Sequence, residues 1–210
     1  MNSANPVNAE TSGSANDPDL MALIDRCLAG DQSAYAALYE RYASSLFRLA
    51  YSVLLDEQDA EDVLQEALVY AFRNLQHYDP ARGAFRTWLY TITISRCRNA
   101  RRRKWLPTVA LANLLSAGVE PSAPADESPE HRAAWAELHE SLRRALATLS
   151  PRLREAVALR YGQGLTYREM AEVMECPQKT AESRIRLAHE QLRKALSAAD
   201  EAALVELWQV

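Results

Sequence analysis

The chain has 210 residues, of which 48% are hydrophobic and 25% charged, and its formal net charge is −4. This composition is typical of a globular protein with one ordinary domain or two small ones, and no run of about 18 apolar residues is present that could span a membrane. The charge is uneven, because residues 35–104 and 135–197 each hold 11 Lys and Arg against 8 Asp and Glu, a net charge of +3 in each stretch. Acidic segments flank both stretches, so each stretch can attract a phosphate backbone that the whole-chain charge would repel.

Residues 1–19 are polar and have neither a basic start nor an apolar stretch. They predict a disordered N-terminal tail rather than a signal or transit peptide, and therefore a cytoplasmic protein. Cys27, Cys97 and Cys176 stand at least 70 residues apart and have no CxxC or Cys-His spacing. We expect partly buried thiols, with no disulfide framework and no zinc site. Since the sequence also has no evident catalytic nucleophile or phosphate-cradling glycine loop, we expect no enzymatic activity, cofactor or metal.

The first strongly patterned segment, residues 59–72, predicts an amphipathic helix. Its apolar positions recur at helical spacing and are Ala60, Val63, Leu64, Ala67, Leu68, Ala71 and Phe72, continued by Leu75. Asp62, Gln65 and Glu66 remain on the opposite side as a compact acidic and amide patch. Such a patch is an ordinary solvated face unless a basic partner docks there.

Residues 77–83 have the composition of a loop, and a further helix is expected from residue 85. Trp88, Leu89 and Ile92 can face a core, whereas Phe85, Arg86 and Tyr90 are expected near the surface. The helix ends in a basic run with six cations in nine positions, namely Arg96, Arg98, Arg101, Arg102, Arg103 and Lys104. Few acids lie near this run in the sequence. Aromatic rings beside cations suit single-stranded DNA, although core packing is the favoured role for Trp88.

Residues 106–134 interrupt the helical pattern with four prolines among Ala, Ser and acids, which predicts a flexible linker. Strand-like alternation is scarce along the whole chain. The sequence therefore predicts an all-α protein with two small helical domains, at residues 20–105 and 135–197, followed by an acidic tail at 198–210. The tail could form a short partner-binding helix or cap the second domain.

The second domain begins with a predicted helix from about residue 135 to 149, and Ser150-Pro151 is typical of the start of the next helix. Thr166 and Glu169 form a capping box that opens a short third helix. Cys176-Pro177 ends that helix and opens a longer one, whose apolar positions are Ala181, Ile185, Ala188 and Leu192. A short helix, a tight turn and a longer helix indicate a helix-turn-helix.

The leading end of the last helix carries polar and cationic side chains. They are Gln178, Lys179, Thr180, Ser183, Arg184 and Arg186. In a helix-turn-helix this end enters the major groove, where Arg and Gln can read base edges while Lys and Ser hold phosphates. The alternative is the solvated face of an ordinary helical hairpin.

Together these segments resemble the sigma-70 family, and in particular its small extracytoplasmic-function class. The resemblance rests on DAEDVLQEA at 59–67, FRTWLYTI at 85–92, the basic run to Lys104, and the order LSPRLREAVALRY, LTYREMAEVM and SRIRLA in the second half. It covers about residues 20–105 and 135–197. The order and spacing of the pieces make it specific, whereas one piece alone would not.

The resemblance implies two helical domains that bind core RNA polymerase and promoter DNA. The polymerase β′ clamp helices would dock on Asp62, Gln65 and Glu66, and the second domain would touch the β flap. The first domain, sigma region 2, would capture and help to melt the −10 element through Tyr78, Phe85, Arg86, Ser95, Arg96, Asn99, Arg102, Arg103 and Lys104. The second domain, sigma region 4, would read the −35 element through Gln178, Lys179, Thr180, Glu182, Ser183, Arg184 and Arg186. An anti-sigma factor is a further partner that the class often has.

Three departures from the family pattern bear on DNA preference. Ser95 stands where Asn is frequent, which shortens the reach of the hydrogen-bonding group. Glu182 places an acid where a base is common, and a carboxylate can accept from cytosine N4 but repels phosphate. Leu187 and His189 replace frequent arginines.

Two other kinds of protein remain compatible with parts of the pattern. A stand-alone helix-turn-helix regulator would bind operators as a dimer without polymerase. A helical adaptor that acts only through protein contacts would leave the basic run and the polar leading end unexplained.

Overall fold

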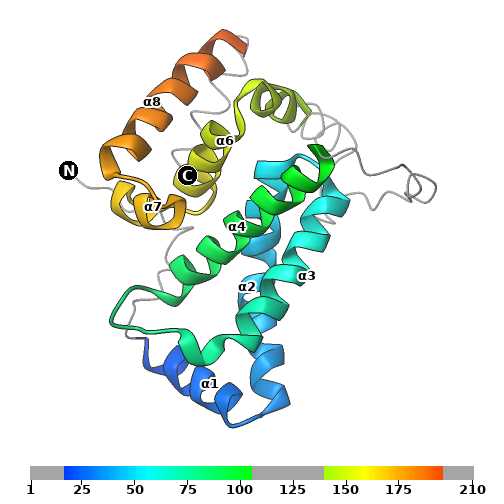
Figure 1. The fold of residues 1–210 in the computed structure, drawn as a ribbon, viewed down its shortest axis with the longest axis vertical. Coiled ribbons are helices and arrows are strands. Elements are labelled where there is room, and N and C mark those ends of the chain that lie inside the picture. Colours follow the sequence, from blue (N-terminus) through cyan, green and yellow to red (C-terminus); the bar gives the residue numbers. More distant parts are fainter. Residues whose placement is uncertain (1–16, 106–139, 196–210) are drawn as a thin grey trace, which may run out of the picture.

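A computed structural model of the chain describes residues 17–105 and 140–195, and the regular elements in these two ranges are helices (Figure 1). The N-terminal module, residues 17–105, contains α1 (Pro18–Leu28), α2 (Gln32–Leu54), α3 (Glu57–Arg73), the 3-10 turn η2 (Leu75–His77) and α4 (Phe85–Trp105). The C-terminal module, residues 140–195, has a helical segment at 140–148. It continues with α6 (Pro151–Val157), the π-helical turn η3 (Ala158–Gly162), α7 (Tyr167–Met174) and α8 (Gln178–Ala195).

The all-α prediction is therefore confirmed for the described residues. Helix α1 begins at Pro18, with the Asp17 carboxylate accepting from the Asp19 and Leu20 amides, so ordered structure starts two residues inside the predicted tail. The remainder of that tail, the predicted linker at 106–134, the first residues of the second domain and the acidic tail at 198–210 lie outside the described residues.

The N-terminal module is built around α2, α3 and α4, which pack against one another. Asp31 and Asp56 cap α2 and α3 by accepting from backbone amides of the first turn, as short acidic side chains do at helix starts. The apolar stripe predicted for α3 is confirmed, because it is turned into the core with only Leu64 and Phe72 partly exposed. The patch at Asp62, Gln65 and Glu66 consequently lies on the outer side of α3.

Helix α4 is covered on two sides, by α2 and α3 on one and by α7 on the other (Figure 1). The prediction that Phe85 and Tyr90 lie near the surface is wrong, since they are only 1% and 2% exposed. The Phe85 ring packs edge-on against Tyr42, with ring centres 5.4 Å apart. Phe85 lies on the same face of α4 as Leu89 and Ile92, so the cover by α2 and α3 alone encloses its ring.

The helix-turn-helix of the C-terminal module forms as predicted. The Thr166 hydroxyl accepts from the Glu169 amide at 3.3 Å, and the Glu169 carboxylate accepts from the Thr166 amide at 2.8 Å, which completes the capping box. The turn after α7 places Glu175 in the left-handed region, at φ 54°. The four apolar positions predicted for α8 are buried. The helix start predicted at Ser150-Pro151 is confirmed, because α6 begins at Pro151, although the Ser150 hydroxyl makes no capping hydrogen bond.

The two modules pack directly against each other, which the sequence did not indicate. Helix α7 lies against α4, while α6 and η3 lie against α2 (Figure 1). Leu159, Met170 and Met174 of the C-terminal module belong to the same apolar core as Tyr90 and Cys97 of the N-terminal module. The described part of the chain therefore has one core that runs through both modules. A second, smaller core lies within the C-terminal module and includes Leu146, Leu149, Leu153 and Leu192.

Candidate nucleic-acid interface

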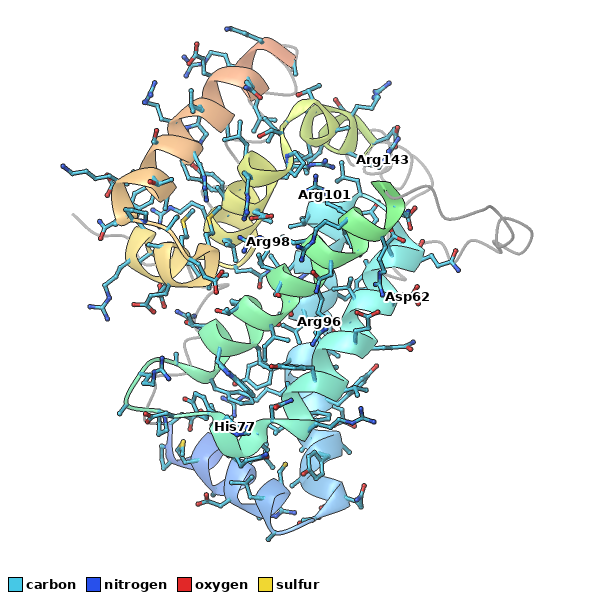
Figure 2. The ribbon with its side chains drawn as sticks, in the orientation of Figure 1. Asp62, His77, Arg96, Arg98, Arg101 and Arg143 are labelled. Carbon is cyan, nitrogen blue, oxygen red and sulfur yellow. The ribbon has the colours of Figure 1, made fainter. Side chains whose placement is uncertain are left out.

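The acidic and amide patch on α3 is open to solvent. Asp62 and Gln65 are exposed, and Asp62 projects from the outer side of α3, away from the C-terminal module (Figure 2). Glu66 is more covered, and its Oε1 accepts from both terminal nitrogens of Arg103 at 3.0 Å. The three side chains share one face of α3, as the helical spacing predicted, and their binding of a basic partner stays a prediction. We refer to Asp62, Gln65 and Glu66 as the α3 ridge.

The loop before α4 is held by an aromatic cluster. The Tyr78 hydroxyl donates to the Gly83 carbonyl at 3.1 Å, and the Tyr78 ring packs on Phe85 and Trp88 with ring centres 5.0 and 5.6 Å apart. Burial, assisted by the nearby Asp79 carboxylate, raises the pKa of Tyr78. Tyr78 keeps a partly exposed edge, whereas Phe85 is enclosed and has no face on which a base could stack. Phe85 therefore cannot contact DNA in this conformation, contrary to the prediction, and it packs beneath the Tyr78 ring instead.

Arg86 connects this part of α4 to the C-terminal module. Its Nη2 donates to Glu169 Oε1 at 2.8 Å, so the carboxylate that caps α7 also binds α4. Burial tends to raise the pKa of Glu169, but hydrogen bonds from the backbone and hydroxyl of Thr166 and from Arg86 outweigh burial and lower it. Arg86 is thus engaged between the modules and is not presented to DNA in this arrangement.

The far end of α4 presents most of the remaining predicted −10 residues. Ser95, Arg102, Arg103 and Lys104 are exposed, and Asn99 accepts a hydrogen bond from Arg102. The Arg96 guanidinium lies over the Tyr70 ring of α3, 4.5 Å from its centre. Lys104 pairs with Asp59 at 2.5 Å and with Asp56 at 3.4 Å. Acids distant in sequence are therefore folded against the basic run, which corrects the expectation that few acids would accompany it.

Arg98 belongs to the same basic run but faces the other way. Arg96 points toward α3, whereas Arg98 and Arg101 point toward the C-terminal module (Figure 2). Arg98 Nη2 donates to Glu155 Oε2 at 2.8 Å and Arg98 Nε donates to Glu155 Oε1 at 3.2 Å. Glu155 has 0% exposure. A buried, bidentate ion pair of this kind is structural, so Arg98 is not part of the DNA-facing set.

The leading end of α8 faces solvent. Gln178, Lys179, Glu182 and Arg186 are exposed, while Thr180 and Ser183 are half-buried. Gln178 Nε2 donates to Glu182 Oε1 at 2.9 Å, so these two side chains are hydrogen-bonded to each other in the DNA-free chain. Arg184 turns back toward the helix-turn-helix turn, with Nη1 3.6 Å from the Cys176 sulfur and 3.9 Å from the Met174 sulfur. The accessible hydrogen-bonding groups are therefore those of Gln178, Lys179, Glu182 and Arg186.

Sequence reasoning missed the residues that hold the basic groups in place. Tyr70, Asp56 and Asp59 contact α4 cations from α3, and Glu155 and Glu169 do so from the C-terminal module. The spacing of the acids along α3 does not indicate which cations of α4 they contact. The sequence held one indication that a second element packs on α4. Thr93 and Cys97 are small residues one turn apart, and both are fully buried in the structure.

The comparisons with known proteins agree with this architecture. Residues 38–106 match sigma-70 region 2, and residues 139–192 match sigma-70 region 4. The RNA polymerase sigma-H factor of Pseudomonas aeruginosa is 36% identical over 180 residues, which are 83% of this chain and 92% of that protein. The ECF RNA polymerase sigma-E factor of Escherichia coli K12 is 35% identical over 175 residues, 80% of this chain and 89% of that protein.

A solved structure with the same fold is that of CnrH in complex with the cytosolic domain of CnrY. It has a TM-score of 0.61 and 28% identity, and the match covers 85% of this chain and 96% of CnrH. No helix within residues 17–105 and 140–195 is long and apolar enough to cross a membrane. The two region matches and the identities to the sigma-H and sigma-E factors show that the chain belongs to the sigma-70 family of RNA polymerase sigma factors, within the extracytoplasmic-function class.

Proposed function

We propose that this chain binds core RNA polymerase and directs promoter-specific transcription initiation. The observation that carries the proposal is the simultaneous exposure of the α3 ridge and of the leading end of α8 on one chain. One surface is suited to a basic protein partner and the other to the major groove of DNA. A DNA-binding hairpin alone would have no use for the ridge.

Each surface has a distinct task in this proposal. The ridge docks on the β′ clamp helices, and the C-terminal module touches the β flap. The exposed end of α4, with Ser95, Arg96, Asn99 and residues 102–104, holds the −10 non-template strand beside Tyr78. Gln178, Lys179, Glu182 and Arg186 engage the −35 duplex, with Thr180, Ser183 and Arg184 supporting them from the half-buried side of α8.

Promoter binding requires the modules to move apart. The −10 and −35 elements are about 25 base pairs apart, roughly 85 Å along B-form DNA, whereas a packed chain of this size is roughly 45 Å across. The segment 106–139 can reach at most about 115 Å when fully extended, which is sufficient for the separation. Polymerase would hold the separated modules at the promoter spacing, so that binding of one element raises the effective concentration of the other.

Melting of the −10 element is driven by capture of unstacked bases. Unstacking a base costs a few kcal/mol, and stacking with phosphate contacts offsets that cost. The chain supplies these contacts and performs no covalent step, since nucleotide addition belongs to the polymerase. This role places the chain in the cytoplasm. We propose an anti-sigma factor as a further partner, because members of this class often have one.

Reconstituted transcription tests the proposal. Purified core polymerase and the full chain should give discrete run-off transcripts from genomic fragments, and the charge-reversed variant Asp62→Lys/Glu66→Lys should lose both core binding and transcripts. An Asp25→Lys/Glu40→Lys variant, which makes the same charge change on exposed carboxylates of α1 and α2 outside the proposed surfaces, controls for net charge. Tight operator binding by the free chain, with no transcripts from the holoenzyme, would instead identify a stand-alone regulator.

A further inference from the structure

Helices α3 and α4 are joined by contacts between the acidic or aromatic side of α3 and the cations of α4. Arg103 pairs with Glu66, Lys104 pairs with Asp59 and Asp56, and Arg96 lies over Tyr70. We call these contacts the α3–α4 seam. Within it, Glu66 has a property that the other acids lack, because it also belongs to the α3 ridge.

Glu66 therefore stands where two surfaces meet. Its Oε1 alone receives both Arg103 nitrogens, at 3.0 Å each. The Glu66 side chain is 36% exposed and the Arg103 side chain 60% exposed, so solvent and incoming partners can reach both groups. A cationic group that docks on the ridge competes with Arg103 for this carboxylate, and a DNA phosphate competes with Glu66 for Arg103.

Resting on the function proposed above, we propose that the Glu66–Arg103 pair couples polymerase docking to DNA binding. In the free chain Glu66 holds Arg103 and weakens its contact with phosphate. When the β′ subunit engages the ridge, Glu66 turns to the partner and Arg103 becomes available to the −10 strand. Because coupling between two binding events is reciprocal, DNA bound at Arg103 also strengthens docking at Glu66.

The ion pairs of Lys104, next to Arg103 in the chain, show how many cations this coupling involves. Lys104 is held by Asp59 and Asp56, which lie in and just before the first turn of α3 and outside the ridge. Docking on the ridge does not compete for those carboxylates, so Lys104 stays paired. The coupling thus concerns one cation, and an exposed ion pair corresponds to about a two- to fivefold change in affinity.

Binding of the free full-length chain to a fluorescent single-stranded 20-mer of thymidine tests the first half of the proposal. In the otherwise unchanged chain, Glu66→Gln should raise the affinity for the oligonucleotide about two- to fivefold. In a chain that already carries Arg103→Gln, adding Glu66→Gln should give no further gain. Glu61→Gln is the matched control, because Glu61 is an exposed α3 carboxylate for which no ion pair is found within the described ranges. An equal gain with Glu61→Gln, or a gain that persists without Arg103, would overturn the proposal.

The second half is tested with saturating core polymerase. The advantage of Glu66→Gln in oligonucleotide binding should shrink to nothing in the holoenzyme, where the β′ subunit has already removed Glu66 from Arg103. An undiminished advantage in a holoenzyme that does form would refute the coupling. Failure to form any holoenzyme would instead refute the proposed function, and the free-chain result distinguishes the two.

Discussion

The two sides of α4 carry the same residue type in opposite environments. On the side toward the C-terminal module, Arg98 is paired with the fully buried Glu155. On the side toward α3, Arg103 is paired with Glu66 and remains 60% exposed. The first pair is bidentate, with Arg98 only 18% exposed and Glu155 enclosed, whereas both side chains of the second pair are open to solvent. Burial, rather than position within a basic run, decides which arginines hold the fold and which remain available to DNA.

The largest expected effect is on the buried side. Glu155→Ala should lower the free energy of unfolding by about 3–5 kcal/mol, because it removes the buried carboxylate of Arg98 and leaves only the exposed Glu175 at 3.9 Å and the Met174 carbonyl at 3.4 Å. Urea denaturation followed by circular dichroism measures the loss. Glu140→Ala removes an exposed partner of Arg143 and should cost less than about 1 kcal/mol. Similar losses in the two variants would mean that the environments do not differ as described.

The second prediction concerns the pH dependence of the Arg86–Glu169 contact. The pKa of Glu169 is lowered in the folded protein, so its stabilisation is present above the ordinary glutamate pKa and is lost as pH falls through the folded value. Glu169→Gln should therefore cost about 1–2 kcal/mol at pH 7 and progressively less below about pH 4.5. Urea midpoints of both proteins between pH 3 and 7 measure this convergence. A cost that stays constant with pH would argue against an ionised contact.

On the exposed side, the expected effect is on DNA rather than on stability. Arg102→Gln should weaken binding of single-stranded DNA a few-fold and reduce the slope of log affinity against log salt by about 0.7, as loss of one phosphate contact does. Arg144, an exposed arginine outside the proposed surface, provides the matched Arg144→Gln control. Fluorescence anisotropy over a range of salt concentrations gives both slopes. Equal changes in the two variants would indicate unspecific attraction.

The smallest effect is expected for the ring beneath Arg96. Tyr70→Ala should cost about 0.5–1 kcal/mol of stability, whereas Tyr70→Phe, which keeps the ring face, should cost little. Thermal denaturation of the two variants separates the cation–π contact from the hydroxyl group. If both variants lose the same amount, the hydroxyl rather than the ring face supports Arg96.

The sequence predicted features that depend on near neighbours. The capping box of Thr166 and Glu169, the buried stripe of α8 and the outward α3 ridge all follow from spacings of three or four residues within one helix. These features were sufficient for the family resemblance. They were also sufficient to identify the exposed leading end of α8.

The rest depends on which helices meet, and a single sequence does not specify that. Periodicity assigns one buried face to a helix, but α4 is covered by α2 and α3 and also by α7, so Tyr90 was wrongly placed near the surface. Phe85 was also misplaced, although it shares the face of Leu89 and Ile92 and packs on Tyr42. The partners of Arg98 and Lys104 lie more than 40 residues away in the chain, at Glu155 and Asp59. The six cations of the basic run therefore looked equivalent in sequence and are not equivalent in the fold.

The core shared by both modules also affects how the free chain melts. Leu159 and Met170 share one core with Tyr90 and Cys97, so neither module can unfold without exposing apolar surface of the other. A calorimetric scan of the polymerase-free chain should consequently show a single cooperative endotherm, although two separate sigma-70 regions are present in the sequence. A destabilising substitution within the helix-turn-helix would then lower the melting temperature of the whole described fold, including the helix that carries the α3 ridge.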